Sequence, residues 1–170
     1  MSYIETAFAH LAFAGKLYHL ACEGRFKRDE IDIPLTFQDQ SQDTVWVLPD
    51  KIFDTDDDLL LAFANSLSVA FGTAGIVLDS ECGRRPNDIE TEADQCRHLI
   101  YQIRNAFAHN MADPHWEIRN PKFQRVFEFG GLQIDLSDVN GKRFEYRDIG
   151  GLDVLECIKD FAIKNHLTKI

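Results

Sequence analysis

The sequence has 170 residues, of which 45% are hydrophobic and 27% charged, and its net charge at pH 7 is -10. This length and composition are typical of one folded domain and exclude a largely disordered chain. The acidic balance argues against a general nucleic-acid coat, because such proteins contact phosphates through many Lys and Arg residues. The charge is uneven, however, since ten acids and one Lys lie between Asp29 and Asp58. An arginine-bearing surface can therefore exist elsewhere on the molecule.

Targeting and cofactor signals are lacking in the sequence. The N-terminus has no basic start of a secretory signal, and we find no apolar run that approaches the roughly 18 to 20 residues needed to cross a bilayer. The cysteines have no C-x-x-C or paired zinc spacing, and we expect them to be reduced thiols packed in the interior: Cys22, Cys82, Cys96 and Cys157. We therefore expect a cytoplasmic protein without a cofactor, a metal or a membrane partner.

The first half of the chain predicts two helices separated by a loop. Apolar spacing predicts a helix over 2–23, and residues 25–50 read as a loop with at most weak strands at 31–33 and 44–47. A second helix begins at Thr55 or Asp56 and runs to about residue 78. Gly72 and Gly75 in its later turns either weaken the helix or let another helix approach closely.

The second half predicts a third helix over 88–111 and then a change to period two. Two β-rich segments, 125–129 and 132–136, flank Gly130-Gly131, which is a signal for a two-residue hairpin turn. Asn140-Gly141 marks a second turn before a possible third strand at 143–146, and a last helix covers 152–166. The predicted fold is mainly α: an antiparallel helical bundle (1–112 plus 152–168) with a β-hairpin or three-stranded meander at about 117–147, in a single domain over 1–170.

The third helix carries an unusual polar surface. At about 100° per residue, one face is apolar and buried: Cys96, Leu99, Ile100, Ile103, Ala106 and Phe107. A polar stripe follows at spacings of four, three and four, formed by His98, Gln102, Asn105 and His109. The adjoining row holds Arg97, Tyr101, Arg104 and Ala108. A solvated helix face usually carries Lys and Glu, and both are missing here after Asp94. We therefore expect this surface to meet a polar or anionic partner.

Arg104 and His109 are the candidate chemical groups, because the arginine stays charged and the imidazole titrates near neutral pH. On an ideal helix they lie about 140° and ~7.5 Å apart. Both reach one phosphate only if Arg104 bends or His109 lies in a frayed last turn. Asn105, one turn before His109, can orient its ring. Alternatively, Arg104 pairs with a carboxylate such as Asp113, and His109 caps the helix.

The segment Arg104-Asn105-Ala106-Phe107-Ala108-His109, followed by Asn110, resembles the R-x4-6-H motif of HEPN domains. The resemblance implies a homodimer through the helix 88–111, with the two motif helices meeting across a two-fold axis. Active members are metal-independent RNA endonucleases, in which the 2′-OH of the RNA is the nucleophile. Arg104 would then bind the scissile phosphate, His109 would transfer the proton and Asn105 would position His109. The predicted hairpin lies outside the minimal family fold.

Several further groups lie beside the motif. His98, Gln102, Tyr101 and Arg97 are candidate substrate-binding residues, although Tyr101 also suits packing between helices. Arg84 and Arg85 form either a basic patch with Arg97 or ordinary solvated charge. Basic residues around the hairpin either extend an RNA-binding edge or protect its edge strands: Arg119, Lys122, Arg125, Lys142, Arg143 and Arg147.

Two functions follow from these observations. The first is a HEPN-like, RNA-binding dimer that is a metal-independent endoribonuclease of toxin-antitoxin or defence type, a setting taken by analogy. The alternative is a catalytically silent HEPN-like module that dimerises through the same helix and binds a protein partner through the acidic region 29–58.

Overall fold

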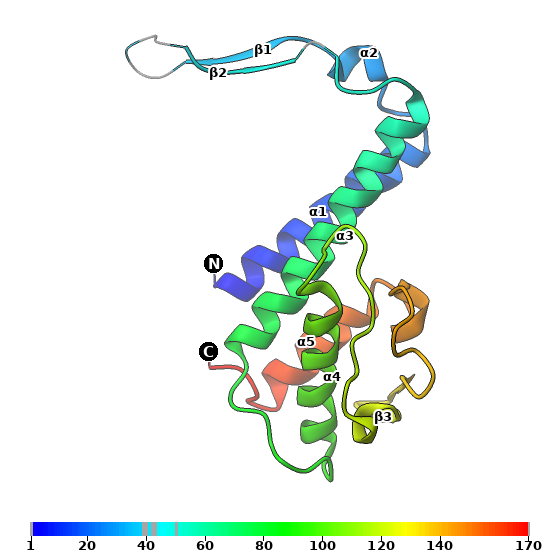
Figure 1. Cartoon of the computed structure of the whole chain (residues 1–170). Coiled ribbons are helices and arrows are strands. Elements are labelled where there is room, and N and C mark those ends of the chain that lie inside the picture. The colour runs from blue at the N-terminus through cyan, green and yellow to red at the C-terminus, as the bar shows by residue number, and fades with distance from the viewer. Residues whose placement is uncertain (1, 39–40, 42–43, 50, 170) are drawn as a thin grey trace. The chain divides into compact units, whose positions relative to one another are not determined.

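The computed structural model describes residues 2–38, 41, 44–49 and 51–169. Within them the protein is mainly α-helical, as the sequence predicts (Figure 1). The elements in chain order are α1 (Tyr3–Cys22), α2 (Arg28–Ile31), β1 (Leu35–Gln38), β2 (Thr44–Leu48), α3 (Asp56–Glu81), α4 (Glu92–Phe107), β3 (Val126–Phe129), β4 (Leu132–Asp135) and α5 (Val154–Lys164). Short 3-10 turns occur at Pro121–Phe123 and Tyr146–Ile149.

The chain divides into two compact units. Unit 1 comprises Met1–Leu11 and Ser68–Ile170, and unit 2 comprises Ala12–Leu67. The long helices α1 and α3 contribute residues to both units, so apolar periodicity runs through the division without a break. A boundary inside a continuous helix leaves no Pro, Gly or polar linker that a sequence pattern could reveal.

Unit 1 is built around α4, which packs against α5 and β3. The predicted apolar face of this helix is confirmed, because all six of the residues assigned to it are buried: Cys96, Leu99, Ile100, Ile103, Ala106 and Phe107. Phe107 belongs to an aromatic cluster, with ring centroids 5.5 Å from Phe71 and 4.8 Å from Phe144. Rings at these separations stabilise a core beyond the area they bury, and this cluster holds the end of α4 that carries the motif.

Helix α3 approaches α4 closely at its two glycines. A Cβ at Gly72 would lie 2.5 Å from Cδ1 of Phe107, and one at Gly75 would lie 3.2 Å from Cγ2 of Ile103. Gly72 and Gly75 therefore let α4 approach α3 closely, which is one of the two roles that the sequence suggests for them.

The C-terminal part of unit 1 contains the predicted hairpin. Strands β3 and β4 are antiparallel and paired from Val126 opposite Asp135 to Phe129 opposite Leu132. The turn residues Gly130 and Gly131 have φ of 55° and 81°, a conformation that two glycines adopt at little cost. The third strand of the alternative meander is not formed, because Arg143 makes an isolated bridge to His115 and the 3-10 turn follows.

Unit 2 contains parts of α1 and α3, the short α2, and the antiparallel pair β1–β2. Phe26 stacks on Phe63 of α3 with centroids 5.0 Å apart. The predicted strand at 31–33 is wrong: Ile31 ends α2, and β1 begins only at Leu35, beyond Pro34. The carboxylate of Glu30 accepts from the backbone N–H of Lys27, so a local capping contact favours the helical turn.

Helix α3 is long and apolar enough to cross a membrane, judged by length and composition alone. Its 18-residue window has a mean hydropathy of 1.7, and 33% of that window is buried. The expectation that no stretch approaches this length is therefore corrected. In unit 1 the buried residues of this helix belong to the core: Ala70, Phe71, Ala74 and Leu78.

The cysteines divide into two pairs by exposure. Cys82 and Cys96 are buried as expected, whereas Cys22 and Cys157 are exposed. Burial raises the pKa of Cys82 to about 11 and raises that of Cys96 as well. Neither buried thiol is a thiolate near neutral pH, so neither is activated as a nucleophile.

Candidate functional site

The motif residues lie at the end of α4, which is shorter than predicted at both ends. Thr91 caps its start, because its hydroxyl accepts from the backbone N–H of Asp94 at 3.1 Å and its own N–H donates to the Asp94 carboxylate at 3.0 Å. The helix ends at Phe107. His109 therefore lies beyond the helix, and the angular separation of an ideal helix does not apply to it.

Arg104 and His109 line the same pocket in unit 1, which encloses about 380 Å³. One wall comes from α4 and the residues after it, namely Tyr101, Gln102, Arg104, Asn105 and His109. The facing wall comes from segments outside the motif, namely Arg85, Glu117, Arg119, Asn120 and Phe123. A volume of this size accommodates a small ligand or one nucleotide of a nucleic-acid strand.

Two hydrogen-bonding groups organise the charges in this pocket. Arg104 donates through Nη1 to Oδ1 of Asn105 at 3.0 Å. Glu117 places Oε2 3.6 Å from Nε2 of His109 and 3.1 Å from Nη2 of Arg119. Asn105 thus positions the guanidinium rather than the imidazole, and the carboxylate that faces His109 is Glu117.

Part of the pocket lining is aromatic and cationic. The guanidinium carbon of Arg85 lies 3.4 Å from the centroid of the Tyr101 ring, a close cation–π stack. Tyr101 is half-buried, and Arg85 is exposed. Tyr101 therefore forms part of the pocket wall, and Arg85 adds positive charge to the pocket that Arg104 also lines.

Two of the predicted substrate-binding residues lie outside the pocket. Arg97 is 7% exposed, pairs with Asp79 at 2.7 Å and donates to the Gly83 carbonyl at 2.9 Å. His98 is buried, with Nε2 3.1 Å from the Pro86 carbonyl oxygen, and its ring packs against Phe123. Burial lowers the pKa of His98, so this ring is neutral near pH 7 and has a packing role.

The alternative pairing for Arg104 is not formed. Asp113 instead forms an ion pair with Arg143, with Oδ1 3.0 Å from Nε. Much of the basic cluster around the hairpin is engaged locally, since Arg147 pairs with Glu145 and Lys122 donates to the Asn87 carbonyl. Arg119 is the member of that cluster that lines the pocket.

The sequence suggests other roles for some of the pocket residues and gives no functional signal for others. For Arg85 the sequence allows either a basic patch or ordinary solvated charge. For Arg119 it allows either an RNA-binding edge or protection of the edge strands. No sequence pattern marks the remaining three, Glu117, Asn120 and Phe123. They lie ten or more residues after the end of α4, and only the tertiary fold brings them to the pocket. Tertiary placement of this kind is not encoded by local periodicity.

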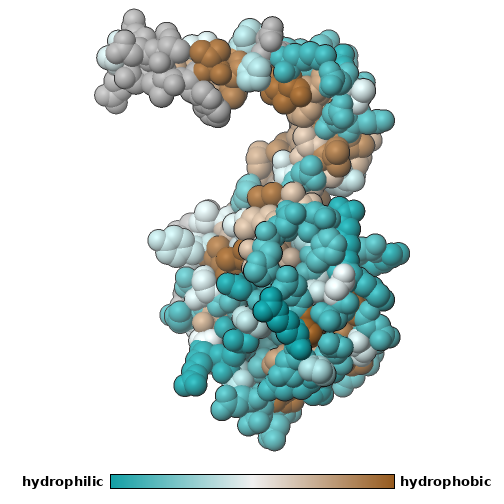
Figure 2. All heavy atoms as spheres, in the orientation of Figure 1, coloured by the Kyte–Doolittle hydropathy of each residue, from teal (hydrophilic) through white to brown (hydrophobic). Residues whose placement is uncertain are grey.

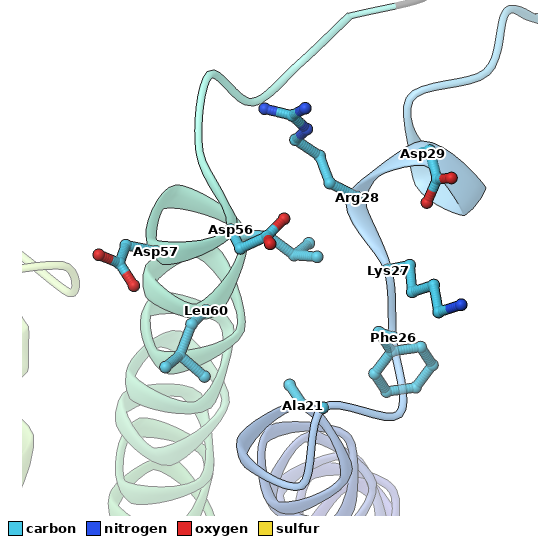
Figure 3. Close-up of a pocket in the computed structure, with 10 residues that line it drawn as sticks. Ala21, Phe26, Lys27, Arg28, Asp29, Asp56, Asp57 and Leu60 are labelled. Carbon is cyan, nitrogen blue, oxygen red and sulfur yellow. The ribbon is translucent and has the colours of Figure 1, made fainter.

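A second hollow, of about 530 Å³, lies in unit 2 (Figure 3). It is lined by residues of both charges, and Figure 3 shows Arg28, at the start of α2, near Asp56 at the start of α3. Arg28 is already engaged, since it donates to the Asp54 carbonyl and approaches Asp32 at 3.9 Å. Mixed and internally paired charge makes this hollow a weaker candidate than the pocket of unit 1.

The chain was compared with known proteins, and no similar protein was found. No protein-family model matches the chain, and no match is found among the curated proteins or the solved structures.

Proposed function

We propose that the protein is a HEPN-like, metal-independent RNA endonuclease whose site is the pocket of unit 1. One observation carries the proposal: Arg104 and His109, five residues apart in the motif, line one cavity together with Arg85 and Arg119. A chain with a net charge of -10 concentrates arginine at this place. Guanidinium groups bind phosphate through paired N–H donors, and an imidazole moves protons near neutral pH.

The reaction follows from the chemistry of RNA. His109 takes the proton of a 2′-OH, and the 2′ oxygen attacks the adjacent phosphorus. The P–O5′ bond breaks, the 5′ oxygen takes a proton from solvent, and the products are a 2′,3′-cyclic phosphate and a 5′-OH end. Arg104 stabilises the negative charge that builds on the phosphorus oxygens. Asn105 holds Arg104, and Glu117 lies where it can orient the imidazole of His109.

The test is cleavage of RNA in the presence of EDTA. Wild type is compared with Arg104→Ala and His109→Ala, and His115→Ala is the matched control because this exposed histidine does not line the pocket. Each pocket variant is expected to lose on the order of a hundredfold in rate, since general base and electrostatic contributions are of that size. Equal rates in all four proteins would remove these residues from the reaction.

A homodimer is part of the proposal. Tyr101, Arg104 and Asn105 of α4 are partly exposed, whereas nine residues of this helix are buried in unit 1. A second subunit approaching this face of α4 would bring its own pocket beside the first. Sedimentation equilibrium measures the association, and a monomer at the concentration used for cleavage would contradict it.

A second candidate function is binding of a protein partner through unit 2, with or without catalysis. Large hydrophobic side chains are exposed on this acid-rich unit: Phe13, Ile33, Leu35, Phe37, Val47, Ile52 and Leu61. Figure 2 shows brown apolar patches beside teal hydrophilic ones around α2 and the adjoining strand. Apolar surface rimmed by polar residues is typical of interaction sites. The partner would carry apolar side chains and basic residues. In-cell cross-linking of wild type against Val47→Ser/Leu61→Ser tests this, since loss of a cross-linked protein is expected in the variant.

A further inference from the structure

Gln102 is a polar residue whose side chain has no hydrogen-bond partner among the described residues of unit 1. The residue is 2% exposed and nevertheless lines the pocket beside Arg104. Among the described residues no hydrogen bond joins its amide to another group, and the amide atoms are not among the buried atoms left without a partner, so they are accessible from the pocket. An amide that is accessible from a pocket can donate and accept hydrogen bonds there. A ligand that pairs with the amide in the pocket gives this arrangement a purpose.

The surroundings of Gln102 define the kind of ligand. Its neighbour Tyr101 presents an aromatic ring stacked under Arg85 at 3.4 Å, and Phe123 forms another part of the wall. Flat apolar and guanidinium surfaces beside a cationic site are the features that bind unstacked nucleobases. An amide adds one donor and one acceptor side by side, which matches the edge of a base that offers one of each.

We infer that the pocket contains a nucleobase subsite in which the Gln102 amide hydrogen-bonds the base edge and the Tyr101–Arg85 stack contacts its face. The inference deepens the proposed function, because it uses the same pocket and places the base next to the phosphate held by Arg104. It makes Gln102 a determinant of base recognition. A base inside a duplex cannot enter this subsite, so the ligand is single-stranded at that position.

Binding of small nucleotides tests the subsite without requiring cleavage. The 3′-monophosphates of adenosine, guanosine, cytidine and uridine are titrated calorimetrically into wild type, Gln102→Leu and Gln102→Met, with ribose 5-phosphate as the ligand that lacks a base. In wild type, at least one nucleotide is expected to bind about tenfold or more tightly than ribose 5-phosphate, because a two-bond contact to a base edge is worth roughly ten- to a hundredfold. Both variants are expected to lose that advantage while their affinity for ribose 5-phosphate is unchanged.

Two controls make the outcome decisive. Thermal melting of both Gln102 variants is expected close to the wild-type temperature, because each replaces an amide that makes no hydrogen bond within the described residues with an apolar side chain of similar size. Arg104→Ala should weaken nucleotide and ribose 5-phosphate alike. The inference is overturned if no nucleotide binds better than ribose 5-phosphate, or if the advantage persists without Gln102. Cleavage in EDTA is measured on the same preparations: Gln102-dependent binding without cleavage defeats the endonuclease proposal alone, and cleavage without Gln102-dependent binding defeats the subsite alone.

Discussion

The contact between Gly72 of α3 and Phe107 of α4 offers a sharp test of how the motif helix is held. A Cβ at residue 72 would lie 2.5 Å from Cδ1, 2.9 Å from Cγ and 3.1 Å from Cβ of Phe107. The ring cannot retreat easily, because it also packs against Phe144 at 4.8 Å and is 1% exposed. Gly72→Ala therefore requires the two helices to separate.

The magnitude follows from two opposed effects. Overpacking a core costs about 1 to 3 kcal/mol, and three close atoms on a confined ring place this site near the upper end. Replacing a helical glycine by alanine returns about 1 kcal/mol. The net loss is about 2 kcal/mol in the free energy of unfolding. For a chain of this size, the loss lowers the melting temperature by about 4 to 8 °C.

Gly75→Ala is the matched control on the same helix. Its Cβ would lie 3.2 Å from Cγ2 of Ile103, a terminal methyl that can move by a few tenths of an ångström. Strain and helix propensity then nearly cancel, so the stability stays within about 0.5 kcal/mol of wild type. Urea unfolding followed by circular dichroism measures both variants. Equal stability of the two would refute the argument that Phe107 fixes the distance between α3 and α4.

Two further predictions concern buried charge in unit 1. Arg97→Met leaves the Asp79 carboxylate without its partner and is expected to lower the free energy of unfolding by about 3 to 5 kcal/mol. The double variant Arg97→Met/Asp79→Leu is expected to recover most of this loss, as measured by urea unfolding. A single variant as stable as wild type would show that the pair is not needed. Burial lowers the pKa of His98 in the folded protein below its ordinary 6.5, so as the pH falls the unfolded chain binds this proton before the folded chain does. The free energy of unfolding therefore decreases as the pH drops below about 6.5, with a slope of up to about 1.4 kcal/mol per pH unit. The decrease ends once the pH is below the pKa of the folded state. Melting temperatures between pH 7.5 and 5.0 should show a shallower decline for His98→Gln, and identical pH profiles would contradict the assignment.

The sequence is most informative where local rules determine the structure. The apolar period of α4 identifies its buried face correctly, and Gly130-Gly131 identifies the β3–β4 turn. Both signals depend on residues that are near one another in the chain. The start of α4 was placed too early, because the reciprocal capping by Thr91 and Asp94 outweighs the weaker start at Asp88.

The candidate site is only partly readable from the sequence. Arg104, Asn105, His109, Tyr101 and Gln102 are found through the helical stripe and the motif. The stripe also predicts an accessible His98, yet the ring is covered by Phe123 and the segment at Pro86. Glu117 reaches His109 through the fold of the chain after α4, and no periodicity reports such a contact. The exposure of apolar residues in unit 2 does not follow from the sequence either, because large apolar side chains are ordinarily expected to be buried.

The central proposal is that Arg104 and His109 direct attack by the 2′-OH of RNA without a metal. Mass spectrometry of the ends produced from a defined single-stranded RNA in EDTA tests it most directly. Wild type should give 2′,3′-cyclic phosphate and 5′-OH ends, His109→Ala should give none at the same time point, and a 2′-deoxy substitution at the cleaved position should stop the reaction. Products with 5′-phosphate ends, or cleavage at the 2′-deoxy position, would contradict the proposal.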